Sequence, residues 1–118
     1  MDPYPLVNRC AIAVTPKSPF WDWVNETSKE IFEDPIVEKT TDSNLYLLPD
    51  YELESDMTQA IQNFVKEHYR EIFVSELEAW NMDPTTFPEI TFDRFEQWFS
   101  ISSHTMIFDM VKKPLRRQ

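Results

Sequence analysis

The chain contains 118 residues, of which 42% are hydrophobic and 14% aromatic, and it contains no glycine. The absence of glycine excludes the P-loop, the dinucleotide-binding fingerprint and the G-x-S-x-G nucleophile elbow, because each needs glycine for a tight turn or for close approach of the backbone to its ligand. The formal net charge is −10, and residues 1–111 carry −14, because four of the eleven basic residues lie in the last seven positions. Such an acidic body repels phosphate groups, so we expect no binding to nucleic acid.

The first predicted element is a buried strand over residues 6–15, with the sequence LVNRCAIAVT and a proline directly after it. Its branched and apolar residues are typical of strands. Alternation places Ala11 and Ala13 on one face of this strand. The other face holds Leu6, Asn8, Cys10, Ile12 and Val14. The two alanines leave room for a helix or a second subunit to approach closely, so we predict Ala11 and Ala13 as interface residues.

A helix is predicted to begin at Ser18, which is a favourable N-cap and is followed by proline. Phe20, Trp23 and Val24 fall on its inner side. Trp21 lies outside that stripe. Trp21 therefore either packs against the rest of the fold or, if it is exposed beside Phe20, anchors a protein interface, because tryptophan is enriched among the residues that dominate binding energy.

The most acidic part of the chain is residues 22–56, with eleven acidic residues against Lys29 and Lys39. Such a stretch either keeps the protein soluble, meets a basic partner, or imitates a nucleic-acid backbone. A short apolar segment within it, Asn44 to Leu48, is followed by proline and aspartate, and we predict it as the second strand.

A long helix is predicted from an N-cap at Ser55 to about Met82, because apolar residues recur at three- and four-residue spacing between them. Thr91 opens a further short helix. A third strand follows over residues 101–111, and we expect it to pair with the first strand at the centre of the sheet.

These elements predict an α+β fold, with a small three-stranded sheet, mixed or antiparallel, covered by one long and two short helices. We expect residues 1–111 to form one domain and residues 112–118 to form a basic tail. Cys10 is the only cysteine, no signal peptide is evident and no apolar run is long enough to span a membrane. We therefore expect a cytoplasmic protein that has no membrane partner.

The second half of the chain resembles a family of small, acidic, uncharacterised bacterial proteins. The resemblance rests on ELEAW, which starts at residue 76, and on FPEITFDRFEQWFSISSHTMIFDMV, which starts at residue 87. Earlier matches are NR at residues 8–9, PK at 16–17, the segment 19–23 and LYL at 45–47. The chain departs from the family at Ala79, where glycine is expected, and at Phe87, where tryptophan is expected. The resemblance supports a single domain and implies no activity and no cofactor.

His104 is the main candidate for chemistry, because imidazole titrates near neutral pH. We predict that it lies mid-strand on an apolar face, where it is either a structural hydrogen-bonding group or part of a pocket flanked by Trp80 and Trp98. Its expected carboxylate partner is Glu76 or Glu78, of which only one can face inward because they are two residues apart on a helix.

A serine hydrolase triad is not expected around His104. The neighbouring Ser103 points to the opposite face of a strand, and Ser102 shares the face but lies about 7 Å away along the strand. The chain also has no glycine with which to shape an oxyanion loop.

His68 and Glu71 are three residues apart on the long helix, a spacing found in carboxylate metal sites. A metal needs further ligands, and a histidine at the margin of an apolar stripe commonly packs its ring there and keeps its nitrogens in water. We therefore predict no bound metal or other cofactor, with these two residues as the candidates if one is present.

Taken together, these features favour a small acidic protein-binding module, an adaptor or regulator that pairs with another protein or with itself, over an enzyme. Two alternatives remain open at this point. One is a small enzyme or ligand-binding protein with its pocket at His104, and the other is an acidic mimic of nucleic acid.

Overall fold

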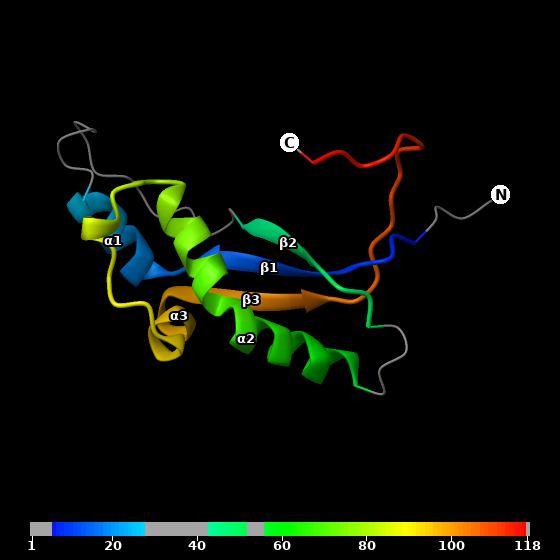
Figure 1. Ribbon diagram of the computed structural model, residues 1–118, viewed down its shortest axis with the longest axis horizontal. Coiled ribbons are helices and arrows are strands. Elements are labelled where there is room, and N and C mark those ends of the chain that lie inside the picture. Colours follow the sequence, from blue (N-terminus) through cyan, green and yellow to red (C-terminus); the bar gives the residue numbers. More distant parts are fainter. Residues whose placement is uncertain (1–5, 28–42, 52–55, 118) are drawn as a thin grey trace.

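The computed structural model describes residues 6–27, 43–51 and 56–117, which form a three-stranded antiparallel sheet with three α-helices and one 3₁₀ helix (Figure 1). The elements in chain order are β1 (Cys10–Pro16), α1 (Ser18–Thr27), β2 (Asn44–Leu48), α2 (Met57–Glu78), the 3₁₀ helix η1 (Pro84–Thr86), α3 (Phe92–Trp98) and β3 (Phe99–His104). The strand order is β2-β1-β3. The α+β prediction, with one long and two short helices, is confirmed.

The central strand β1 has two different faces, as its alternating sequence predicts. Cys10, Ile12 and Val14 are at most 1% exposed and belong to the hydrophobic core. Ala11 and Ala13 point to the other side of the sheet because successive side chains alternate. The pairing places Ala11 opposite Leu47 of β2 and His104 of β3. β1 therefore sets which face of both neighbouring strands meets the helices.

The predicted bounds of β2 are confirmed, whereas β3 differs from its prediction. β3 begins at Phe99, opposite Pro16, and ends at His104. Because the strand order is β2-β1-β3, β3 occupies an edge of the sheet and β1 alone is central. Beyond β3 the pairing resumes only at an isolated bridge between Leu6 and Phe108. Between the last β1–β3 pair, Ala11 with His104, and this bridge, the first segment advances by five residues and the second by four. Such an unequal number of residues interrupts the hydrogen-bonding ladder between two strands. The same interruption makes β1 start later than predicted.

Helix α1 buries more of its surface than its periodicity predicts. Phe20 is 1% exposed and Trp21 is 4% exposed, so Trp21 packs within the fold and the alternative of an exposed interface anchor is wrong. The physical reason is that α1 packs on two sides at once. Phe20 contacts Phe99 at a ring distance of 5.2 Å, and Trp21 contacts Trp80 beyond the end of α2 at 5.4 Å.

The helix ends are fixed by local side chains. Asp56 caps α2 by accepting a hydrogen bond from the Gln59 amide, and the predicted cap at Ser55 lies outside the described residues. α2 ends at Glu78, earlier than predicted, with Ala79 at its C-cap in a right-handed conformation with φ of −62°. Thr91 caps α3 as predicted. No described residue has positive φ, so the fold of this part of the chain needs no glycine.

An aromatic cluster fills the space between the helices and the sheet. Phe20, Phe73, Phe95 and Phe99 are each at most 2% exposed, and ring distances of 5.2 to 5.9 Å join them. Trp23 ties α1 to η1, because its indole N–H donates to the Thr86 carbonyl oxygen at 2.8 Å. None of the described helices has the length and hydrophobicity that crossing a bilayer requires.

The chain after β3 runs along the surface and turns back above the sheet in the view of Figure 1. Residues 111–117, which include most of the predicted basic tail, are exposed. Much of the predicted acidic stretch, residues 28–42 and 52–55, lies outside the described residues. The nucleic-acid mimic that rested on this stretch stays a prediction.

Candidate functional site

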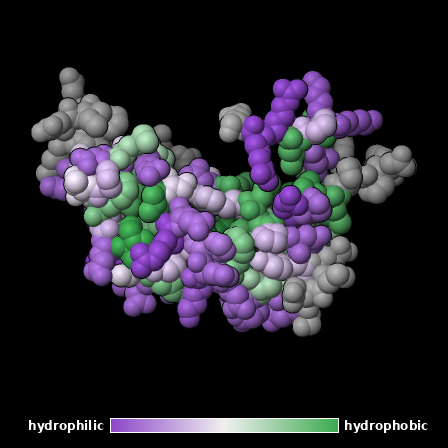
Figure 2. Space-filling view, in the orientation of Figure 1, coloured by the Kyte–Doolittle hydropathy of each residue, from purple (hydrophilic) through white to green (hydrophobic). Residues whose placement is uncertain are grey.

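One face of the sheet carries exposed leucines, although Ala11 on the same face is only 3% exposed. On β2, Leu45 is 70% exposed and Leu47 is 53% exposed. The strand register places Leu45 opposite Ala13 and Leu47 opposite Ala11, so large and small apolar side chains lie side by side. Figure 2 shows hydrophobic surface in the part of the view where β2 lies. We call the outward residues of the three strands the open sheet face.

The open sheet face carries no acidic residue. Alternation assigns to it Ala11, Ala13, Thr15, Leu45, Leu47, Ser100, Ser102 and His104. Its only titratable side chain is His104, although the whole chain has a net charge of −10. This part of the surface is therefore free of the like-charge repulsion that the rest of the molecule presents to another acidic body.

His104 is exposed on this face, so the prediction that it lies in the core or in a pocket between Trp80 and Trp98 is wrong. The physical reason is the register of β3, in which Phe99 and Ile101 face the helices and His104 has the opposite parity. Neither predicted carboxylate partner reaches it. Glu76 is buried at α2, on the other side of the sheet, and Glu78 is exposed.

Ser102 contacts His104, against our expectation. Its Oγ lies 3.0 Å from His104 Nε2, because side chains on one face of a strand lean along it and shorten the gap between alternate residues. No described carboxylate bonds the other imidazole nitrogen, so the pair lacks the orienting group of a catalytic triad.

His68 and Glu71 lie together on α2 without a third ligand. Their Nδ1 and Oε1 atoms are 3.4 Å apart, and the His68 ring stacks on Phe64 with a centroid distance of 4.2 Å. Among the residues that the structure describes, no group of three or more His, Cys, Asp or Glu side chains is placed to hold a metal ion. The contact is a helix-surface pair next to an aromatic ring.

Glu76 is the one buried charged side chain in the described part of the chain, with 3% exposure. Its Oε2 accepts hydrogen bonds from the Tyr46 hydroxyl at 2.6 Å and from Asn44 Nδ2 at 2.7 Å. Burial and then the hydrogen bond to Glu76 raise the pKa of Tyr46 above its ordinary value, so the hydroxyl keeps its proton and remains a donor. Sequence reasoning missed these partners, although alternation in NLYLL places Asn44 and Tyr46 on one face.

Beside this carboxylate is a pocket of about 520 Å³, which we call the Glu76 pocket. It is lined by Pro16, Trp21, Ser43, Asn44, Glu76, Ala79 and Trp80. The Trp21 and Trp80 rings meet edge to face, 80° apart. Trp21 Nε1 is buried and, in the described part of the chain, has no hydrogen-bond partner. The pocket thus combines a buried carboxylate with residues that carry two indole rings, and the N–H of one of these rings is buried and unsatisfied.

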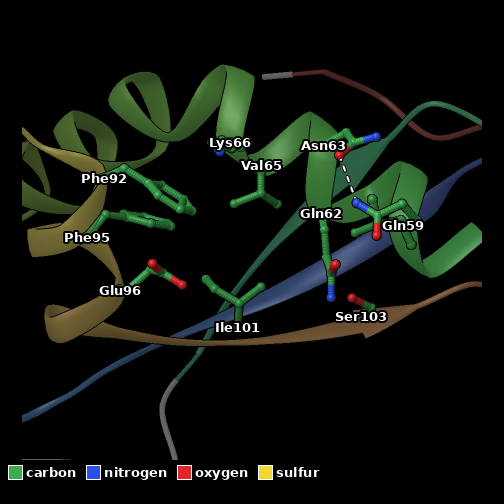
Figure 3. A pocket seen from close by; sticks show the side chains of 11 residues that line it. Gln59, Gln62, Asn63, Val65, Lys66, Phe92, Phe95, Glu96, Ile101 and Ser103 are labelled. Atoms are coloured by element: carbon green, nitrogen blue, oxygen red, sulfur yellow. Dashed lines mark hydrogen bonds between the residues drawn. The ribbon is translucent and has the colours of Figure 1, made fainter.

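A second cavity, of about 470 Å³, lies between α2 and β3 (Figure 3). Phe92 and Phe95 of α3 close one end of it, and Gln59 hydrogen-bonds to Asn63 at the other. Polar side chains such as Gln62 and Glu96 surround Ile101 and Val65. The described polar groups that line this cavity include no buried side-chain atom without a partner.

No family model, curated protein or solved structure matches the chain, so a functional assignment has to be argued from the sequence and the structure. The family resemblance seen in the sequence therefore stays a prediction.

Proposed function

We propose that this chain is a small acidic protein-binding module that pairs with a second copy of itself through the open sheet face. The observation that carries the proposal is the arrangement on β1 and β2, where exposed Leu45 and Leu47 lie beside Ala13 and Ala11. Large exposed apolar side chains that cluster on one face mark an interaction site.

The alternation of large and small side chains makes this face self-complementary. In a two-fold dimer the same patch serves both partners, so the leucines of one copy can pack over the alanines of the other. Ala13 is partly exposed and has no side chain beyond Cβ, so a second copy can approach it closely, whereas Ala11 is only 3% exposed. This is the contact that the alanines of β1 predict.

The distribution of charge also favours association through the open sheet face. Two copies of a chain with a net charge of −10 repel each other over most orientations. The open sheet face lacks acidic residues, so an approach through it brings no carboxylates of the two copies directly together on the strands. Binding is favoured over hydrolysis at this face because Ser102 and His104 have no described carboxylate to complete a triad.

Sedimentation equilibrium at several protein concentrations tests the proposal. We expect the wild-type chain to dimerise and the Leu45→Asp variant to remain monomeric, because an acid in the interface would be buried against the apolar face of the second copy. Met82→Asp is the matched control, since Met82 is 76% exposed and lies outside the sheet. It should dimerise like the wild type. A wild-type chain that stays monomeric at every concentration would overturn the proposal.

A further inference from the structure

The Glu76 pocket is separate from the open sheet face, and we propose that it binds a small organic cation: an alkylammonium compound that also carries an acceptor oxygen. A volume of about 520 Å³ lies within the range of roughly 300–1,000 Å³ typical of small-molecule sites. The class of ligand follows from the charge, the rings and the donor that line the pocket.

The carboxylate supplies the first requirement. Glu76 is buried, yet the groups that bond it, the Tyr46 hydroxyl and the Asn44 amide, are neutral. A buried carboxylate whose only hydrogen-bond partners are neutral has no counter-charge beside it. No Lys, Arg or His is among the described residues that line the pocket. A cationic ligand would provide the missing counter-charge.

The geometry of the carboxylate leaves it able to accept that ligand. Both hydrogen bonds end on Oε2, and no described residue hydrogen-bonds Oε1. Tyr46 and Asn44, both on β2, thus hold the carboxylate in one orientation and leave its second oxygen for an ammonium group. Ser75 Oγ lies 3.2 Å from the same Tyr46 hydroxyl and further restricts it.

The indole ring of Trp80, which is half-buried and packs on the buried Trp21 ring, supplies the second requirement. Trp21 and Trp80 both line the pocket, and their centroids are 5.4 Å apart. The face of an indole ring attracts cations, methylated ammonium groups among them. A carboxylate beside aromatic rings therefore favours a charged alkylammonium group over a neutral molecule of the same shape.

The third requirement comes from Trp21 Nε1, which is buried without a partner in the described part of the chain. An unpaired buried donor is uncommon in folded proteins. Because Nε1 is inaccessible from the pocket in this structure, an acceptor oxygen on the ligand would reach it only after the Trp21 ring turns. Choline, with a quaternary ammonium group and a hydroxyl, meets all three requirements and is a suitable probe.

The test is a titration of the full chain with choline, followed through the indole N–H signals of the tryptophans by NMR. We expect saturable shifts of the Trp21 and Trp80 signals. Dimethylbutanol, the uncharged carbon isostere of choline, should bind about tenfold more weakly or not at all. A parallel titration with acetylated trimethyllysine amide compares the affinity for a methylated lysine side chain with the affinity for choline. The tighter binder indicates whether the pocket takes its trimethylammonium group from a protein or from a free small molecule.

Variants separate ligand binding from a purely structural role of Glu76. Glu76→Gln keeps the shape of the side chain and removes its charge, so choline affinity should fall about tenfold or more. Gln62→Ala, in the second cavity, is the control and should bind choline as the wild type does. If Glu76→Gln fails to fold, Trp80→Leu replaces it, because it keeps the carboxylate, removes a half-buried ring and should weaken binding similarly.

Three results would overturn the proposal. These are the absence of saturable shifts with choline and with the trimethyllysine compound, equal affinity for choline and dimethylbutanol, and unchanged choline affinity in a folded Glu76→Gln variant. None of them depends on whether the chain dimerises.

Discussion

On the helix side of β2, Asn44 and Tyr46 hydrogen-bond to a buried carboxylate, whereas on the opposite side Leu45 and Leu47 are more than half exposed. Four consecutive residues thus alternate between a polar site under a helix and an apolar surface open to solvent. The difference teaches that the covering helix, rather than the hydrophobicity of a residue, decides what each position of this strand does. The side chains on the helix side contact many neighbours, whereas the leucines on the open sheet face are exposed.

The largest loss of stability is expected from a substitution in the tightly packed core on the helix side of the sheet. Phe95 is 0% exposed and contacts the rings of Phe73 and Phe99. Phe95→Ala should lower the free energy of unfolding by about 3–5 kcal/mol, because the cavity it leaves cannot collapse fully. Urea denaturation measures this change.

The matched control for Phe95→Ala is Leu45→Ala on the open sheet face. In dilute protein, where the monomer predominates, it should change the free energy of unfolding by no more than about 0.5 kcal/mol. Equal losses in the two variants would mean that both faces of the sheet are packed alike, and the comparison would fail.

A smaller effect is expected from removing the buried acceptor on the helix side. Glu76→Ala leaves the Tyr46 hydroxyl and the Asn44 amide without their acceptor, and should cost about 1–3 kcal/mol of the free energy of unfolding. Glu78→Ala, two residues further along α2 and exposed, should cost no more than about 0.5 kcal/mol. The same urea titration compares them, and a loss for Glu78→Ala as large as that for Glu76→Ala would contradict the assignment.

The smallest expected effect is a dependence of the free energy of unfolding on alkaline pH. Burial raises the pKa of Tyr46 above its ordinary value of 10.0. Above that value the unfolded chain releases the Tyr46 proton while the folded protein retains it. The contribution of this group to stability is therefore complete below about pH 10 and is lost as the pH rises further.

We therefore expect the free energy of unfolding of the wild type to fall more steeply than that of Tyr46→Phe between about pH 9 and about pH 11. Urea titrations across this range measure the difference between the two slopes. Parallel slopes would show that Tyr46 titrates alike in the folded and unfolded chains.

Local features were predictable because they depend on neighbours in the sequence. The bounds of β2, the cap at Thr91 and the two faces of β1 follow from turn residues, hydroxyl caps and alternation. The fold class follows in turn from the order of these elements. Of the candidate site residues, Glu76 and Trp80 do line a pocket, but not together with His104.

The sequence by itself determined the order of the strands and helices and which residues share a face, because the spacing of residues along a regular element sets the direction of their side chains. Only the tertiary structure decided which face is covered. His104 is exposed because β3 pairs with β1 in a register that turns Phe99 and Ile101 toward the helices. Trp21 is buried because Trp80, far away in the sequence, packs against it. Such outcomes depend on contacts between distant segments, which the periodicity of one segment does not specify.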